Sequence, residues 1–110
     1  MELVKIDIPN EFKIVKNELY NYDINTDSNI DNRYKYLQED ILQITLSNLT
    51  IDLGWYGDLE HGKGCFKIFL VKNQNWDSII ETLSADTISQ VKEELNKLIK
   101  RVQGLSKNLP

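Results

Sequence analysis

The residues best suited to covalent or metal chemistry are few in this chain. It has one histidine, His61, and one cysteine, Cys65, which lie on either side of a glycine-rich stretch and could form a nucleophile–base pair only with each other. Cys65 opens an apolar run typical of a buried strand, and no glycine spacing matches a phosphate loop or a nucleophile elbow. One cysteine and one histidine cannot form a Cys/His zinc site. We therefore expect no catalytic centre, no metal and no cofactor.

Acidic residues dominate one stretch of the chain. Between Lys35 and Lys63 there is no lysine or arginine, yet Glu39, Asp40, Asp52, Asp58 and Glu60 all lie there. Residues 1–62 hold twelve acidic and five basic residues, whereas residues 63–110 hold five acidic and eight basic ones. A stretch without compensating cations repels phosphate backbones and attracts basic protein surfaces. The alternative is that these carboxylates are scattered over a solvated surface and only keep the protein soluble.

Three large aromatic residues could add a contact surface, because aromatic rings stack on sugars, bases and partner side chains. Alternation puts Trp55 on an inward face, so we expect it, and also Trp76, in the core. Tyr56 falls on the other face with Asp52, which favours a protein contact. The predicted partner-binding residues are Glu39, Asp40, Asp52, Tyr56, Asp58, Glu60 and His61.

The elements that position these residues are clearest in the middle of the chain. Residues 49–56 (LTIDLGWY) alternate apolar and polar side chains, as a half-buried strand does. Residues 65–72 (CFKIFLVK) are nearly all apolar, which suits a central strand. The two should pair, and the glycine-rich residues 57–64 between them predict an exposed hairpin loop that carries the acidic residues and His61 to the sheet edge.

The N-terminal part is less regular. Residues 4–8 alternate and predict a short strand that ends at Pro9. Residues 12–19 favour a helix by their apolar spacing, although an extended segment stays open. The Asn- and Asp-rich residues 21–32 predict a loop. A short helix should follow from Tyr34 to about Ile41 or Leu42, with Asp31 or Asn32 as N-cap.

The C-terminal helix is the strongest prediction. One apolar stripe runs through residues 87–103, with Ser84 or Asp86 as N-cap and Gly104 as the stop, followed by a tail. Residues 73–75 predict a turn, and residues 76–83 lead into the helix. The fold class is thus α+β in a single domain, residues 1–110. An antiparallel sheet of three to four strands should carry the long helix on one face, with one or two shorter N-terminal helices.

Several broad classes of protein are disfavoured. No apolar run is long enough for a membrane span and no basic leader precedes an apolar segment, so we expect a cytoplasmic protein without a membrane partner. The last helix carries basic residues that could suggest nucleic-acid binding, namely Lys92, Lys97, Lys100 and Arg101, but Glu93 and Glu94 interrupt that face. No nucleic-acid partner is expected.

Residues 51–58 (IDLGWYGD) carry a family resemblance, together with residues 37–43 (LQEDILQ), 66–68 (FKI) and 75–77 (NWD). Over roughly residues 34–100 the chain resembles small bacterial immunity proteins, those encoded beside polymorphic and contact-dependent growth inhibition toxins. Proteins of that kind are small α+β domains that bind a toxin domain and cover its active site. Such toxins are frequently nucleases with basic clefts, so the resemblance implies a basic protein partner and no catalytic activity.

Two other functions stay open at this point. One is a small-molecule or sugar-binding domain, possibly enzymatic, that uses Trp55, Trp76, His61 and the loop carboxylates. A pocket lined by those side chains would favour it. The other is a phage-type inhibitor that mimics nucleic acid with the same acidic surface. The genes that neighbour the coding sequence would distinguish this last case, because an immunity gene should directly follow a large toxin gene.

Overall fold

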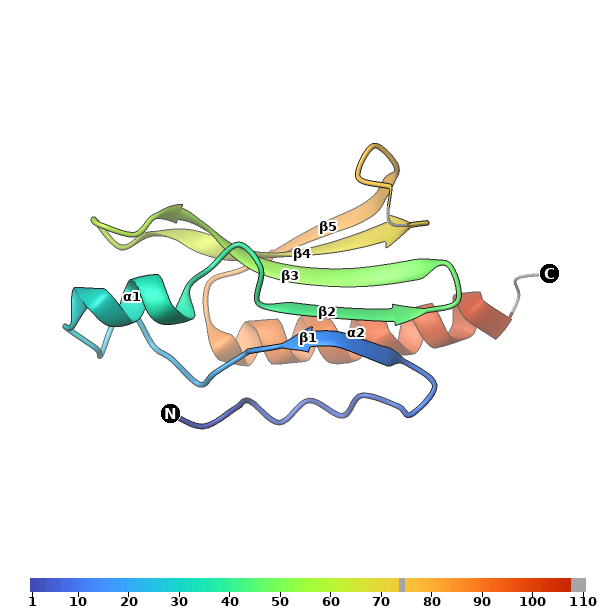
Figure 1. Cartoon of the computed structure of the whole chain (residues 1–110), viewed down its shortest axis with the longest axis horizontal. Coiled ribbons are helices and arrows are strands. Elements are labelled where there is room, and N and C mark those ends of the chain that lie inside the picture. The colour runs from blue at the N-terminus through green and yellow to red at the C-terminus, as the bar shows by residue number, and fades with distance from the viewer. Residues whose placement is uncertain (74, 108–110) are drawn as a thin grey trace.

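The computed structural model describes residues 1–73 and 75–107. Its elements are β1 (Lys13–Asn17), α1 (Ile30–Tyr36), β2 (Leu42–Leu46), β3 (Leu49–Asp58), β4 (Lys63–Lys72), β5 (Ile79–Ala85) and α2 (Ile88–Lys107). The strands form one antiparallel meander in chain order, and α2 runs along one face of it (Figure 1). The α+β class with a long C-terminal helix is confirmed, but the sheet has five strands and not three to four. In the described residues no helix could span a membrane.

The two central strands are confirmed as β3 and β4. They pair in register from Leu49 opposite Lys72 to Asp58 opposite Lys63. Because the strands continue to Asp58 and Lys63, the connecting turn is shorter than the predicted loop. Leu53 and Trp55 are buried on the face that α2 covers, as alternation predicts.

The fifth strand, β5, lies in a region that the sequence pattern predicted only as a lead into the helix. It pairs with β4 from Ala85, opposite Phe66, to Ile79, opposite Val71, with an irregularity near its start. Glu81 of β5 forms an ion pair with Arg101 of α2. The predicted turn at residues 73–75 includes residue 74, which lies outside the described residues.

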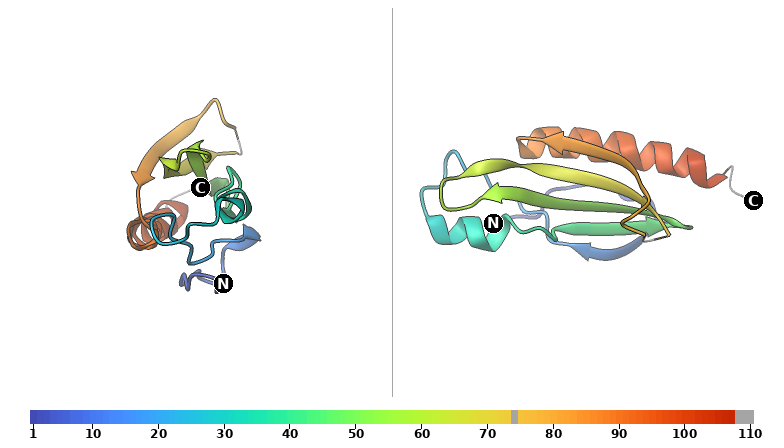
Figure 2. Two further views of the ribbon diagram at one scale, coloured as in Figure 1. Left: turned by 90° about the vertical axis from the view of Figure 1, so that its left-hand side faces the viewer. Right: turned by 90° about the horizontal axis from the view of Figure 1, so that it is seen from above.

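The core lies between α2 and the sheet. The predicted stripe of α2 is confirmed, because Val91, Leu95, Leu98, Ile99 and Val102 are all buried. Facing them are the inward side chains of the three central strands, which include Leu42, Ile44, Ile51, Leu53, Ile68 and Leu70. Figure 2 shows α2 on one side of the sheet in both turned views. Burying apolar side chains in this way stabilises the fold by about 1.5–3 kcal/mol for each large residue.

The start of α2 differs from the prediction. The N-cap is Thr87, whose Oγ1 accepts a hydrogen bond of 3.1 Å from the Gln90 backbone N–H. The Gln90 side chain in turn accepts 2.8 Å from the Asp86 N–H. The Thr87 hydroxyl thus satisfies the backbone donor of the third helical residue, and the Gln90 side chain satisfies that of the residue before the N-cap, an arrangement that differs from a capping box by one residue. Ser84 and Asp86 are therefore not the N-cap.

The end of α2 also differs, because the helix continues through Gly104 to Lys107. Ser106 shares a hydrogen bond of 3.0 Å with Ser47 in the β2–β3 turn, which holds the last helical turn against the sheet. The predicted stop at Gly104 is wrong, as is the tail over residues 105–107; residues 108–110 of that tail lie outside the described residues.

Gly104→Ala should therefore stabilise the protein. A Cβ at Gly104 would meet nothing within 4 Å, and alanine in a helix interior is favoured over glycine by about 0.5–1 kcal/mol. Urea unfolding followed by circular dichroism would measure the change. A loss of stability would show instead that Gly104 ends the helix in solution.

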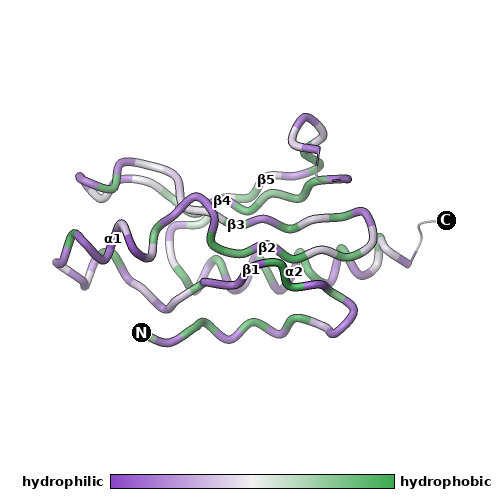
Figure 3. The backbone as a smooth tube through the Cα atoms, viewed as in Figure 1, coloured by the Kyte–Doolittle hydropathy of each residue, from purple (hydrophilic) through white to green (hydrophobic). Residues whose placement is uncertain are grey.

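The N-terminal predictions need two corrections. Residues 4–8 do not form a strand; Leu3 makes an isolated bridge to Tyr20, and the Val4 N–H donates to the Leu19 carbonyl at 2.8 Å. Residues 2–4 instead lie beside residues 19–21, and Val4, Ile6 and Ile8 of the N-terminal segment, which runs below β1 in Figures 1 and 3, pack against the core. The favoured helix over residues 12–19 is wrong as well. Residues 13–17 are strand β1, because the edge of β2 supplies backbone partners to an extended chain.

The short helix forms earlier than predicted. The loop prediction for residues 21–32 is confirmed for most of its length, but α1 begins at Ile30 with Asn29 as N-cap, not Asp31 or Asn32. The Asn29 side chain accepts 3.0 Å from the Asp31 N–H. The helix ends at Tyr36, so Leu37 turns into the core and Ile41 already belongs to the approach to β2. Leu37 and Ile41 are thus apolar because both are buried in the core, and not because they lie on one face of a helix.

Candidate protein-binding site

The sheet has a second face that α2 does not cover. Strand alternation turns one set of side chains away from the helix; we call these the open face, and they are Gln43, Thr45, Thr50, Asp52, Tyr56, Cys65, Lys67, Phe69, Val71 and Thr82. The helix α1 lies beside the β3–β4 turn, where Arg33 Nη1 donates to the carbonyls of Leu59 and Glu60 at 3.1 Å. Thr50, Asp52 and Val71 of this set are buried and the others are at least partly exposed, so the open face presents polar and aromatic groups around a largely covered centre.

Glu39 and Asp40 reach the open face through a break in the pairing of β3. The Ile41 N–H donates to the Leu53 carbonyl at 2.9 Å, and the Trp55 N–H donates to the Gln38 carbonyl at 2.8 Å. The two residues between these bonds therefore bulge out from the sheet edge. Both are exposed.

Gly54 makes room for this bulge. A Cβ at Gly54 would overlap the carbonyl of Glu39 and lie 3.0 Å from Cε2 of Tyr56. The Tyr56 hydroxyl also donates to the Glu39 carbonyl at 3.4 Å. The missing side chain thus lets the bulge and the tyrosine ring close over β3 next to Asp52.

Asp52 is the most unusual residue of the site. It is 7% exposed, and within the described residues its carboxylate has neither a hydrogen-bond donor nor an ion-pair partner. Its cross-strand neighbours are Gln43 and Phe69. Burial, and then the negative charge of Asp40, raise the pKa of Asp52 to about 6, while Lys16 acts in the opposite sense. We call Glu39, Asp40, Asp52 and Tyr56 the acidic corner.

Tyr56 begins a row of aromatic rings on the open face. Its ring meets Phe69 edge-on with centroids 5.9 Å apart, and Phe69 meets Trp76 in the same way at 5.6 Å. Burial, followed by the charges of Asp52, Glu39 and Asp40, raises the pKa of Tyr56. Trp76 is 49% exposed. The prediction that Trp76 lies in the core is wrong, because the β4–β5 connection holds it against Phe69 on the open face.

Lys16 is a member of the site that the sequence did not reveal. Its Nζ lies 3.2 Å from the Asp40 carboxylate and 3.4 Å from that of Glu18. It comes from β1, which was not predicted as a strand, so no sequence signal linked it to the acidic stretch. Lys67 on β4 places its Nζ 5.8 Å from the Tyr56 ring centre. One basic residue thus flanks each side of the acidic corner.

The other three predicted contact residues, Asp58, Glu60 and His61, lie farther along β3 at the hairpin tip. Asp58 accepts hydrogen bonds from the His61 N–H at 3.2 Å and shares one of 2.6 Å with its Nδ1. These bonds lower the pKa of Asp58. Arg33 approaches the same turn through its bonds to backbone carbonyls. The structure therefore divides the predicted set into the acidic corner and a tip with a cation beside it.

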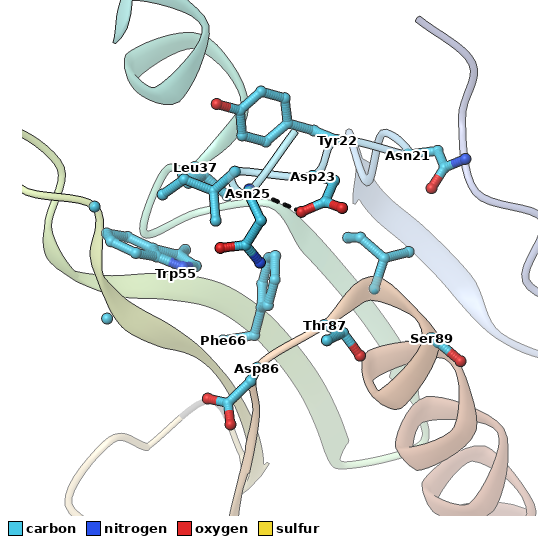
Figure 4. Close-up of a pocket in the computed structure, with 14 residues that line it drawn as sticks. Asn21, Tyr22, Asp23, Asn25, Leu37, Trp55, Phe66, Asp86, Thr87 and Ser89 are labelled. Carbon is cyan, nitrogen blue, oxygen red and sulfur yellow. Dashed lines mark hydrogen bonds between the residues drawn. The ribbon is translucent and has the colours of Figure 1, made fainter. Parts of the chain in front are cut away.

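A cavity lies on the opposite side of the sheet from the aromatic row. It has a volume of about 280 Å³, and Tyr22, Trp55 and Phe66 line it together with Asp86, Thr87 and Ser89 at the start of α2 (Figure 4). Trp76 and His61 do not line it. The side chains that the small-molecule hypothesis required to meet in one pocket are thus placed apart.

No group of three His, Cys, Asp or Glu side chains in residues 1–73 and 75–107 is arranged to hold a metal ion. No protein-family model, curated protein or solved structure matches this chain.

Proposed function

We propose that this chain is an immunity-type protein that binds a basic bacterial toxin, of the nuclease kind, and blocks the toxin's active cleft with the acidic corner. One observation carries the proposal: carboxylates from two separate segments, the bulge and β3, meet on the open face around Tyr56. Glu39 and Asp40 come from the bulge and Asp52 from β3. The resemblance of residues 51–58 to immunity proteins supports the same function.

The acidic corner has the composition of a protein contact. Aromatic residues supply rigid contact area with few rotamers to fix, and they concentrate where interfaces gain most of their energy. Here Tyr56, Phe69 and Trp76 form a row beside three carboxylates. A basic cleft would approach such a surface quickly, because opposite potentials raise association rates to about 10⁸ M⁻¹s⁻¹ at low salt. Once this protein covers the active cleft, the toxin is inhibited and no catalytic step is needed.

The hairpin tip is a weaker candidate for first contact. The Asp58 carboxylate is already engaged by His61, and Arg33 adds a positive charge to the same turn. A partner would have to compete with both. We therefore place the main docking surface at the acidic corner, with Glu60 and His61 at its margin.

Two alternative functions would involve either another partner for the acidic corner or another part of the structure. A nucleic-acid mimic would present the acidic corner to a DNA-binding protein, and its gene would not follow a toxin gene. A small-molecule binder would use the cavity that Trp55 lines, where three aromatic rings and the start of α2 suit a small polar ligand. The toxin hypothesis accounts for the acidic corner, which the cavity does not include.

Charge reversal tests the proposal. The toxin domain encoded beside this gene is purified, and its association with this protein is measured by stopped flow at low and high salt. Glu39→Lys with Asp40→Lys should slow association at low salt by about tenfold or more, because the corner would then repel a basic cleft. The effect should shrink as salt screens the charges.

Two matched double variants complete the test. Asp58→Lys with Glu60→Lys should slow association less, and Glu2→Lys with Asp7→Lys, the same charge change on the N-terminal segment, should have the smallest effect. A larger effect at residues 58 and 60 would move docking to the hairpin tip. If all three pairs associate at the wild-type rate, or if the protein fails to inhibit the toxin, the proposed function is wrong.

A further inference from the structure

Asp52 differs from the carboxylates of the fold that have a partner. Asp40 has Lys16, Asp58 has His61 and Glu81 has Arg101. Asp52 is more than nine-tenths buried and, within the described residues, lacks any such partner. A buried carboxylate without a partner costs free energy, and a bound cation with hydrogen-bond donors removes that cost.

The two nearby lysines do not fill this role. Lys16 is held by Asp40 and Glu18, and Lys67 lies over the Tyr56 ring. Neither forms an ion pair with Asp52 in the described part of the chain. Asp52 is largely buried, but its carboxylate oxygens are not among the unpartnered buried atoms of the described residues, so they reach the surface of the open face and can be contacted by a group from outside.

Two aromatic rings lie next to Asp52. Phe69 is the cross-strand neighbour of Asp52, and the Tyr56 ring leans over Gly54 toward it. The two rings meet edge-on at 5.9 Å. A carboxylate beside such rings favours a flat cation that can stack and donate two parallel hydrogen bonds.

We propose that Asp52, Tyr56 and Phe69 form a subsite for one arginine side chain of the partner protein. Arginine fits better than lysine because its guanidinium is planar and weakly hydrated, whereas the lysine ammonium is compact and strongly hydrated. The identity of the partner as a toxin rests on the proposed function; the subsite itself rests on the geometry around Asp52. The pKa of Asp52, raised by burial, should fall when the guanidinium binds.

Small probes test the subsite without a toxin. N-acetyl-arginine amide and N-acetyl-lysine amide are titrated into the full chain near neutral pH, and the side-chain carboxyl ¹³C signal of Asp52 is followed by NMR. The arginine probe should give a saturable shift and lower the pKa of Asp52. Its dissociation constant should be about fivefold lower than that of the lysine probe, because only the guanidinium group can stack on the rings and form a bidentate hydrogen bond with the carboxylate.

Three variants sharpen the test, each with amide spectra to confirm the fold. Asp52→Asn should abolish saturable arginine binding, followed through the Tyr56 and Phe69 ring signals. Tyr56→Leu should weaken arginine binding more than lysine binding, and Asp7→Asn, the same change on the exposed N-terminal segment, should leave both unchanged. Equal affinity for the two probes, or wild-type arginine binding by Asp52→Asn, would overturn the subsite.

The two proposals can fail separately. If the arginine probe binds as described but the neighbouring toxin is not inhibited, the subsite stands and the proposed function falls. If the toxin is inhibited and Asp52→Asn inhibits it with unchanged affinity, the function stands and the arginine subsite falls.

Discussion

Gly54→Ala is expected to destabilise the protein by about 3 kcal/mol, near the upper end of the range for overpacked sites. The added methyl would lie 2.7 Å from the carbonyl carbon of Glu39 and 3.0 Å from the Tyr56 ring. Relief requires the bulge to move away, which breaks the hydrogen bond from the Trp55 N–H to Gln38. Urea unfolding would measure the loss, and amide spectra of residues 38–41 should show the displacement.

Gly104→Ala is the matched control, because the same methyl is added where it meets nothing within 4 Å. The two substitutions should change the free energy of unfolding in opposite directions. If Gly54→Ala is as stable as the wild type and its spectra at residues 38–41 are unchanged, the bulge does not lie against β3. The acidic corner would then lose its structural basis.

The predictable parts of the fold are those in which burial of one face requires apolar residues at regular intervals. The central strands β3 and β4 and the stripe of α2 face each other across the core, so each inward position must be apolar. Leu53 and Trp55 on the sheet and Leu95 and Leu98 on the helix follow this requirement. Their periodicity of two or of 3.6 residues is therefore visible in the sequence.

The outer strands β1 and β5 escaped prediction for the opposite reason. Ile14 and Val15 of β1 and Ile79 and Ile80 of β5 are exposed apolar residues next to one another. A strand at the sheet edge is covered less completely, so burial imposes no clean alternation on it. These segments are strands because their backbones pair with β2 and β4, and this pairing produces little pattern in the local sequence.

The acidic corner was half predictable. Alternation correctly separates Asp52 and Tyr56 from the buried face of β3, and the missing basic residues after Lys35 mark the acidic stretch. Asp52 was expected to be an exposed contact, but it is buried, because Gly54 lets the Tyr56 ring and the bulge close around it. No pattern among neighbouring residues in the sequence indicates that the Tyr56 ring and the bulge cover Asp52.

Burial of Asp52 links stability to pH. Its pKa rises from the ordinary 3.8 to about 6 in the folded protein, so the folded state holds this proton more tightly than the unfolded chain does. Stability from this group is therefore complete below about pH 4 and is lost as the pH rises through 6. The charged groups that act on Asp52 are Asp40 from the bulge and Lys16 from β1, and Lys67 of β4 and Tyr56 of its own strand lie on the same face.

Asp52→Asn should consequently be more stable than the wild type above pH 6, by up to about 3 kcal/mol. The difference should vanish toward pH 4, because both proteins then carry a neutral side chain at this position. Urea unfolding of both proteins from pH 4 to 8 measures it. Asp58→Asn provides the control of opposite sign, since the bonds from His61 lower the pKa of Asp58 and the charged form is the one stabilised. If Asp52→Asn is less stable than the wild type at pH 8, the carboxylate has a favourable partner in the folded protein, and the unpaired charge on which arginine binding depends does not exist.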